Sequence, residues 1–397
     1  MTARTVAMAF LLAGPLALFP LLVAKPAAAI DLHVVGGEEM VFAWNRQHCE
    51  TWDVPDAPAR AFRDAKGDVR LYISHFVTRA MTGPSLSQVR HDCAVVFRGG
   101  EKDEPQAYDD RLWLASFWTA DGLTVHGLAH AEYHGQHRPA ICPAAKYMAC
   151  WQNSVVQTVS TDGGRTFARA GGSAAAVATL PYRYDADAGR PTGYFSPSNI
   201  ISRDGYHYAF IFAAAYGEQR RGACLLRTER IDDPRSWRAW DGEDFTVAFA
   251  DPYRQDVTDV TGHACTPIAP FPSAVSTVVR VAAKGPYVAA FTAKLQTPGQ
   301  ATPIAGVYYA QSADLITWSA PRLLFAAPTL GMRDCADHAV YAYPSLLDEN
   351  SPSRNFEEIG TTAYLYLTRL NPKDCKVTAD RDLVRIPVAV TTGAADR

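Results

Sequence analysis

The sequence predicts an all-β protein that folds as a five-bladed β-propeller. Short runs rich in β-branched and aromatic residues recur along the chain, separated by clusters of Gly, Asp, Asn and Pro. After residue 30, no long stretch has the 3.6-residue period of a helix. A turn signature also repeats between the runs, which is typical of an architecture built from similar units. An all-β chain of this size has many sheet edges to cover, and a closed ring of sheets covers them.

The runs that we predict as strands span residues 69–73, 94–97, 113–117, 124–130, 155–160, 206–212, 276–281, 287–292, 306–310, 363–367 and 383–390. The turn signature places Ser or Thr before an Asp-containing turn and an aromatic residue four or five positions after the Asp. It occurs at 160–167, 228–237 and 312–318. The Asp caps the turn between two strands, and the aromatic ring packs between neighbouring sheets. The signature is therefore structural.

These turns divide the strands into five groups of four. The predicted inner strands start near Ala57, Trp113, Tyr194, His263 and His338. The segment 34–44 precedes the first group and supplies the last outer strand, which closes the ring. A six-bladed, sialidase-like propeller is the alternative.

Residues 1–29 are predicted as a secretory signal peptide, and residues 30–397 as a single β-propeller domain. Arg4 supplies the basic start, residues 7–23 are apolar, and 27–29 match the small-residue cleavage rule. No later segment is apolar enough to span a membrane. We therefore expect a periplasmic or secreted monomer with no membrane insertion after signal cleavage.

Composition excludes several classes of protein. Hydrophobic residues make up 48% of the chain and charged residues 20%, so a core can form. The net charge is -3, which gives no basic face for a nucleic-acid partner. The sequence also lacks a G-x-S-x-G elbow, a P-loop, an H-E-x-x-H motif and a dinucleotide fingerprint.

Eight cysteines in a secreted chain predict four disulfides. Cys142 with Cys150 encloses a short loop and is the best single pair. Cys335 with Cys375 is a second expected pair. No C-x-x-C spacing indicates a zinc cluster.

Two of the turns carry a resemblance to known families. Residues 160–167 resemble the Asp-box of sialidase-type propellers, and 312–318 resemble the S-x-D-x-x-x-W turn of five-bladed arabinanase- and invertase-type enzymes. The strings Arg-Asp-Pro, Glu-Gly-Pro and Asn-Asp-Pro-Asn of those enzymes are absent, so the chain resembles a divergent member of the propeller glycosidase group. The resemblance implies hydrolysis of a poly- or oligosaccharide by paired carboxylates. It implies no certain cofactor, with a structural calcium ion or a water molecule on the propeller axis as the options.

The resemblance also implies that an Asp at the start of the first blade is the base or nucleophile. Asp56 or Asp53 matches this position, and Pro55 and Pro58 restrict ladder bonding beside them. The alternative reading of Asp56 is a turn cap.

A second candidate cluster lies in the run 124–134. As a strand it places His126, His130, Glu132 and His134 on one face, because side chains alternate with a period of two. Such polar groups need partners when they are buried. The interpretations left open are a catalytic Glu with His neighbours, a metal site, or a solvated face near the rim.

Glycoside hydrolysis needs a protonated carboxyl group and an ionised one. Glu132 is the predicted acid, Asp56 the base or nucleophile, and Asp92 a third, orienting carboxylate. No residue is predicted as a metal ligand in this scheme. The residues that we predict to bind substrate are Arg60, His130, Tyr133, His134, Ser198, Asn199, His263 and His338.

Two alternatives from other classes remain. A polysaccharide lyase would use His134, His263, Tyr133 and Arg60 to abstract a proton beside a uronic carboxylate. A non-catalytic propeller would bind a carbohydrate or a protein without cutting it.

Overall fold

The computed structural model describes residue 1 and residues 30–142, 146, 148–297 and 299–392. Apart from Met1, the predicted signal peptide lies outside the described residues. The described part is almost entirely β-structure. Its helical elements are short: α1 (Trp44–Gln47), η1 (Pro105–Ala107), η2 (Gly135–His137), η3 (Gly172–Ala175), η4 (Pro234–Ser236) and η5 (Thr261–His263). None of these helices is long and apolar enough to span a membrane.

The strands form antiparallel blades that follow one another along the chain. The first blade contains β3 (Arg60–Arg63), β4 (Val69–Ile73), β5 (Val77–Gly83) and β6 (Arg90–Arg98). The second contains β7 (Arg111–Trp118), β8 (Val125–His134), β9 (Trp151–Ser160) and β10 (Ala176–Ala178). The third contains β11 (Thr192–Phe195), β12 (Ile201–Arg203), β13 (Tyr206–Ala213), β14 (Gly222–Thr228), β15 (Arg238–Trp240) and β16 (Phe245–Val247). A short parallel pairing of β11 with β9 joins these two blades.

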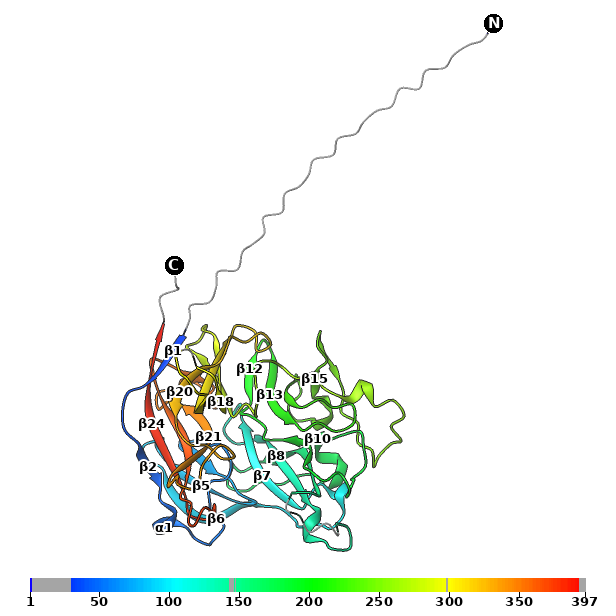
Figure 1. Ribbon diagram of the computed structural model, residues 1–397, viewed down its shortest axis with the longest axis horizontal. Helices are drawn as coiled ribbons and strands as arrows, with labels where there is room; N and C mark the ends of the chain where they lie inside the picture. Colours follow the sequence, from blue (N-terminus) through cyan, green and yellow to red (C-terminus); the bar gives the residue numbers. More distant parts are fainter. Residues whose placement is uncertain (2–29, 143–145, 147, 298, 393–397) are drawn as a thin grey trace.

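The fourth blade contains β17 (Thr277–Val281), β18 (Tyr287–Leu295), β19 (Ile304–Ser312) and β20 (Arg322–Ala326), with β22 (Glu358–Ile359) beside β17. The fifth contains β21 (Val340–Leu347), β23 (Thr362–Leu370) and β24 (Arg381–Thr392). The N-terminal strands β1 (Ile30–Val34) and β2 (Glu39–Phe42) both pair with β24, so the two ends of the chain meet in one sheet (Figure 1). This confirms the predicted closure by the segment that precedes the first blade.

One large hydrophobic cluster lies in each gap between neighbouring blades. Each combines buried residues of two successive blades, for example Tyr72 with Leu114, Leu128 with Ile211, Phe210 with Phe291, Val288 with Ile386, and Leu71 with Tyr366. The last two gaps are filled because the fifth blade contacts both the fourth and the first. Five blades with five filled gaps make a closed ring, so the predicted five-bladed propeller is confirmed for the described residues. The six-bladed alternative is wrong.

Two of the predicted turns show how Asp and an aromatic residue cooperate. The Asp162 carboxylate accepts hydrogen bonds from the backbone of Arg165 and Thr166, which lie in the same turn. Burial opposes ionisation there, but the bonds from Thr166 and its neighbours lower the pKa of Asp162 to about 2. In the later turn, Trp318 packs against Phe271 and Phe210, so its ring lies between the third and fourth blades.

The predicted start of the fourth blade is wrong. His263 lies in η5, and the inner strand of that blade begins at Thr277 instead. The segment between β16 and β17 is tied to β14 by the Cys224–Cys265 disulfide, and Cys265 N–H donates to Gln219 Oε1. Cys265 is thus held by a disulfide and a side-chain acceptor, and the segment between β16 and β17 contains η5 and no strand.

The guanidinium of Arg60 links the inner ends of four blades. It leaves β3 and donates to Ala115 O of the second blade (2.8 Å), Ser276 O beside the fourth (2.5 Å) and Ser345 Oγ of the fifth (3.3 Å). The side chain is buried, and this desolvation lowers the pKa of Arg60 to about 9. Arg60 therefore fills the propeller axis with a positive charge, which disfavours a calcium ion at the same level.

All eight cysteines form disulfides, in four pairs. Cys142–Cys150 and Cys335–Cys375 are the two pairs expected from the sequence. Cys49–Cys93 and Cys224–Cys265 complete the set. A fully paired set of this kind fits an extracellular or periplasmic compartment.

Replacing the axial cation should destabilise the whole ring. We expect Arg60→Ala to lower the free energy of unfolding by about 3 kcal/mol or more, because two carbonyl oxygens and a hydroxyl group lose their buried donor. Urea unfolding followed by tryptophan fluorescence measures the change. Arg165→Ala removes an exposed arginine that bonds within its own turn and is the matched control, with an expected change below about 0.5 kcal/mol. Equal stability of the two variants would contradict the role of Arg60.

Candidate functional site

A cavity of about 230 Å³, here called the mouth pocket, opens where the inner strands of the five blades meet. All five blades contribute to its lining, which includes Asp56, Trp113, Glu132, Ser196, Ser276 and Tyr343. Its volume lies just below the range of about 300–1,000 Å³ that is usual for small-molecule sites. The pocket mixes aromatic surface with a few convergent polar groups, which is typical of a ligand-binding site.

Asp56 enters the mouth pocket from the segment before β3, and three side chains hold its carboxylate. Arg381 at the start of β24 forms an ion pair and hydrogen bond with Oδ1. The Tyr343 hydroxyl donates to the same oxygen (3.3 Å), and Trp113 Nε1–H donates to Oδ2 (3.3 Å). The backbone is fixed as well, because Asp56 N–H donates to Ser74 O (3.0 Å). The carboxylate is thus oriented from the first, second and fifth blades at once.

Two non-glycine residues that line the mouth pocket have left-handed backbone conformations. The φ angle is +56° at Tyr343 and +46° at Ser196. Tyr343 lies where the β21–β23 register shifts, between Ala342 and Ser345. Such conformations store strain and are common at functional sites, where the surrounding structure enforces them. With its backbone in this conformation, Tyr343 directs its hydroxyl group to Asp56.

Glu132 approaches the pocket from β8 together with two imidazoles. Glu132 Oε2 lies 2.6 Å from His134 Nε2, and Oε1 lies 3.5 Å from His130 Nδ1. The three residues share one face of the strand, as the period of two predicts. His134 also stacks on Trp151, with ring centroids 4.1 Å apart. The packed rings leave Glu132 little freedom to move.

The surroundings of Glu132 favour its protonated form. Burial is the largest cause, and the charges of Asp56 and Asp110 add to it, so the pKa of Glu132 rises to about 7. The charge of Arg111 opposes the rise, as does that of His130 when its ring is protonated. Burial also lowers the pKa of His134 to about 4 and depresses the pKa of His130. Both imidazoles are therefore neutral near pH 7.

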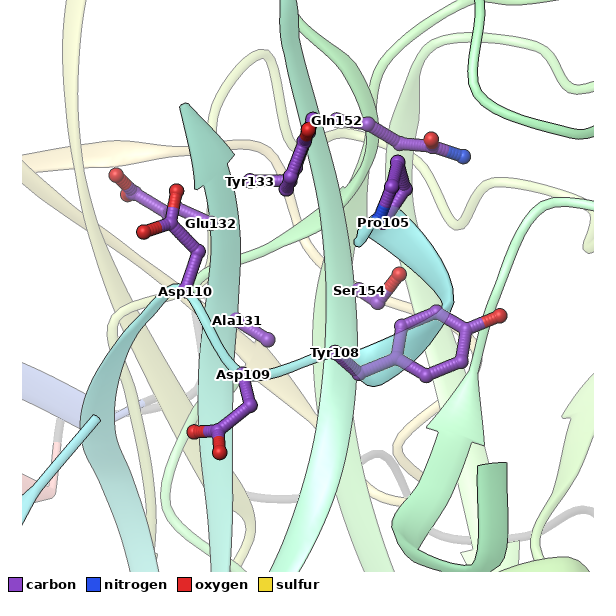
Figure 2. Close-up of a pocket in the computed structure, with 9 residues that line it drawn as sticks. All are labelled: Pro105, Tyr108, Asp109, Asp110, Ala131, Glu132, Tyr133, Gln152 and Ser154. Carbon is purple, nitrogen blue, oxygen red and sulfur yellow. The ribbon is translucent and has the colours of Figure 1, made fainter. Parts of the chain in front are cut away.

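A small cavity of about 10 Å³ lies behind Glu132, against β8, β9 and the segment before β7. Figure 2 shows the carboxylates of Glu132 and Asp110 on one side of β8, with the Tyr133 ring turned away from them. Asp110 Oδ2 accepts from His134 N–H (2.8 Å) and from Arg138 Nη1–H (2.9 Å). This space holds at most one water molecule, so the substrate-sized space is on the mouth-pocket side.

Three predicted binding residues lie on the axis beneath the mouth pocket. Arg60 supports its base through the carbonyl groups of Ala115 and Ser276. Ser198 is fully buried, and its hydroxyl oxygen accepts a hydrogen bond from Phe210 N–H of the same blade. Asn199 exchanges two hydrogen bonds with the backbone of Val278. Arg60 and Asn199 join different blades, Ser198 bonds within the third blade, and none of the three lines the pocket.

Other predicted site residues lie elsewhere. The Tyr133 hydroxyl donates to Asp103 O on the far side of β8. Asp92 is exposed on the outer strand β6 and accepts from Ala94 N–H. His263 contacts Ala248 O in the loop before the fourth blade, and His338 is exposed before β21. The structure therefore brings together Asp56, His130, Glu132 and His134 from the predicted set.

The sequence did not reveal Arg381, Tyr343 or Asn153. Arg381 is 325 residues from Asp56, and only ring closure brings them together. Asn153 lies on β9 opposite Glu132. In the sequence it is a single amide residue just before a predicted strand, and nothing local marks it as part of a site. Trp113, considered as a sugar-stacking residue, does line the mouth pocket.

The side chains of β8 do not converge on one metal position. Among the described residues, the one group of three possible ligand atoms within 4.8 Å of one another belongs to Cys49, Asp53 and His91. Cys49 is bonded to Cys93, and His91 Nε2 lies 2.7 Å from Asp53 Oδ2. That group is a buried hydrogen-bonded cluster beside a disulfide.

No protein-family model and no curated protein matches the chain. Solved structures that resemble it include an α-L-arabinanase from Cellvibrio cellulosa, with 11% identity, a TM-score of 0.43, and 87% of this chain and 91% of that one covered. A protein of unknown function from Dyadobacter fermentans has 8% identity, a TM-score of 0.47, and coverage of 91% and 99%. An endo-arabinase from Bacteroides thetaiotaomicron has 14% identity, a TM-score of 0.38, and coverage of 74% and 79%. Likeness at this level carries no activity to this chain, so function has to be argued from the site.

The raised pKa of Glu132 makes stability depend on pH. The folded protein holds this proton more tightly than the unfolded chain, so the free energy of unfolding falls as pH rises from about 4.5 to about 7. We expect the free energy of unfolding of Glu132→Gln to decrease by roughly 3 kcal/mol less than that of the parent over this pH range. Urea unfolding at pH 4.5 and pH 8 measures it for both proteins. Glu243→Gln, at an exposed carboxylate, should keep the original pH dependence, and a Glu132→Gln variant that also keeps it would contradict the assignment.

Proposed function

We propose that the protein is a glycoside hydrolase that acts on a poly- or oligosaccharide. The observation that carries this proposal is a pair of carboxyl groups, Asp56 and Glu132, on one cavity with opposite surroundings. Asp56 is ion-paired with Arg381. Glu132 lies between two neutral imidazoles, and the pKa of its carboxyl group is about 7. Glycoside hydrolysis needs one ionised and one protonated carboxyl group, and different surroundings supply both.

In the proposed reaction, Glu132 gives its proton to the leaving oxygen while the bond from that oxygen to the anomeric carbon breaks. Asp56 either attacks the anomeric carbon or removes a proton from the attacking water. In both cases the proton balance closes when water supplies a hydroxyl group to the sugar and a proton to a carboxylate. Trp113 and Tyr343 offer aromatic surface for a sugar face, and Ser196 offers a hydroxyl group.

The contacts favour hydrolysis over the lyase alternative. The lyase set required Tyr133 and His263 near a uronic carboxylate, but the Tyr133 hydroxyl bonds to Asp103 O and His263 bonds to Ala248 O. Arg60 is fully engaged with blade carbonyls beneath the pocket. No described contact favours a purely binding role over catalysis.

The four disulfides support placing this enzyme in the periplasm or outside the cell. The ring closes on itself within residues 30–392, which supports a single propeller domain over 30–397.

Activity should depend on both carboxyl groups. We expect Glu132→Gln and Asp56→Asn each to lower kcat by at least about 1,000-fold, since each variant loses one of the two protonation roles. Release of reducing ends from arabinan, xylan, mannan and levan measures the activity. Products should show no ultraviolet absorbance from an unsaturated sugar, because that would indicate a lyase.

The matched controls are Glu243→Gln and Asp187→Asn, which alter exposed carboxylates away from the pocket. Both should retain the parent activity. Full activity of Glu132→Gln or Asp56→Asn would contradict the proposal.

A further inference from the structure

Asn153 on β9 is fully buried, and its amide group has a single chemically sensible orientation. Its Nδ2–H donates to Thr192 O at 2.8 Å. The reverse orientation would place two oxygen acceptors against each other. Asn153 Oδ1 therefore faces His130 Nε2, at 3.1 Å, and can only accept a hydrogen bond there.

This contact determines which nitrogen of His130 carries its proton. The ring is buried and neutral, so it holds one proton, and the acceptor at Asn153 Oδ1 requires that proton on Nε2. His130 Nδ1 is then a lone pair, and it faces Glu132 Oε1 at 3.5 Å. A bare carboxylate oxygen would repel this lone pair, whereas a protonated Oε1 can donate to it.

The other oxygen of Glu132 has the complementary partner. His134 Nε2 lies 2.6 Å from Oε2, and with the Glu132 proton on Oε1 this contact is a donation from Nε2–H to Oε2. His134 Nδ1 is buried and has no hydrogen-bond partner among the described residues. Oε2 is thus the acceptor side of the carboxyl group and Oε1 the donor side. The two histidines therefore assign the proton to one atom of Glu132.

We infer that Asn153 is a positioning residue which, through the tautomer of His130, keeps a transferable proton on Glu132 Oε1. The inference rests on the proposed function for the use of that proton. For its place it rests on the hydrogen bond between Asn153 and His130 and on the 3.5 Å approach of His130 Nδ1 to Glu132 Oε1. When the proton leaves for the glycosidic oxygen, Oε1 becomes a carboxylate oxygen facing a lone pair. That state is unfavourable, so Glu132 regains a proton. The attacking water supplies it if Asp56 is the nucleophile, and solvent supplies it if Asp56 is the base that takes the proton of the attacking water.

Other charged and titratable groups face Glu132 from the packed elements. Arg111 lies opposite it on β7 and favours the carboxylate, whereas Asp110 before β7 and Asp56 before β3 favour the acid. Tyr343 from β21 lies near enough for the Glu132 charge to affect its ionisation. Asn153→Leu changes none of these charges and adds none, so a shift in the Glu132 titration of this variant reports on His130.

The test compares Asn153→Leu with Asn153→Asp in the full chain. Leucine removes the acceptor, so His130 can place its proton on Nδ1, donate to Oε1 and hold Glu132 ionised. We expect Asn153→Leu to lower the pH at which Glu132 titrates by about one unit. In Asn153→Asp, a protonated carboxyl oxygen can donate to Thr192 O as the amide does, and the other oxygen keeps an acceptor for His130. The Glu132 titration of this variant should stay at or above that of the parent.

The titration is read from the protonated carboxyl band in infrared difference spectra against Glu132→Gln, and the tautomer from histidine ring nitrogen NMR. Asn355→Leu is the matched control, because Asn355 also uses its amide for two backbone contacts, both with Thr119. It should lose stability without moving the Glu132 titration. A merely structural role of Asn153 would give the same result for both leucine variants.

Two outcomes would overturn the inference. One is a parent protein whose His130 carries its proton on Nδ1, a measurement that needs no variant. The other is an unchanged titration in Asn153→Leu. Failure of the proposed function is distinguishable, since hydrolysis that survives Glu132→Gln refutes the catalytic role while the tautomer and the titration shift still stand.

Discussion

The buried guanidinium of Arg60 is the contact on which the geometry of the site depends. It donates to groups of the second, fourth and fifth blades from its position on the first. Ala115 and Ser276, whose carbonyl groups it binds, also line the mouth pocket. Among the described residues, the hydrogen-bond partners of this charged side chain at the base of the pocket are carbonyl and hydroxyl oxygens. Removing a charge from water is costly, and carbonyl groups from several blades together offset that cost.

Ring closure converts separations along the sequence into contacts at the pocket. Asp56 comes before the first blade and Arg381 begins the last strand, yet they form one ion pair. β1 and β2 complete the fifth blade by pairing with β24 and hold that strand in register. The orientation of Asp56 thus depends on pairing at the opposite end of the chain. A propeller suits a site of this kind because each blade contributes a few side chains to one axis.

The sequence predicted the position of a residue correctly where that position follows from strand periodicity. It failed where the position depends on contacts between residues far apart in the chain. Alternation along β8 correctly placed His130, Glu132 and His134 on one face, and the Asp-containing turns correctly indicated repeated sheets. His263 was assigned to an inner strand because the spacing of blades was treated as regular, but a disulfide-tied loop of Asp, Pro and Thr occupies that interval. Asp92 looked like a site carboxylate from its neighbours in sequence, although its strand is the outermost of its blade. Arg381 had no local signal at all, since its role exists only after closure.

The two carboxyl groups of the pocket differ through the kind of partner each one has. Their side chains are similarly shielded, with 18% of Asp56 and 12% of Glu132 exposed, so burial alone does not separate them. Arginine keeps its charge under almost all conditions, and Arg381 therefore compensates the charge of Asp56. Imidazole loses its charge when it is buried, so His130 and His134 offer Glu132 only neutral hydrogen-bonding atoms. A neutral ring can be a donor on one side and an acceptor on the other, which a guanidinium cannot. The histidines therefore give Glu132 one oxygen that accepts and one that donates, a division that two arginines in the same places would abolish.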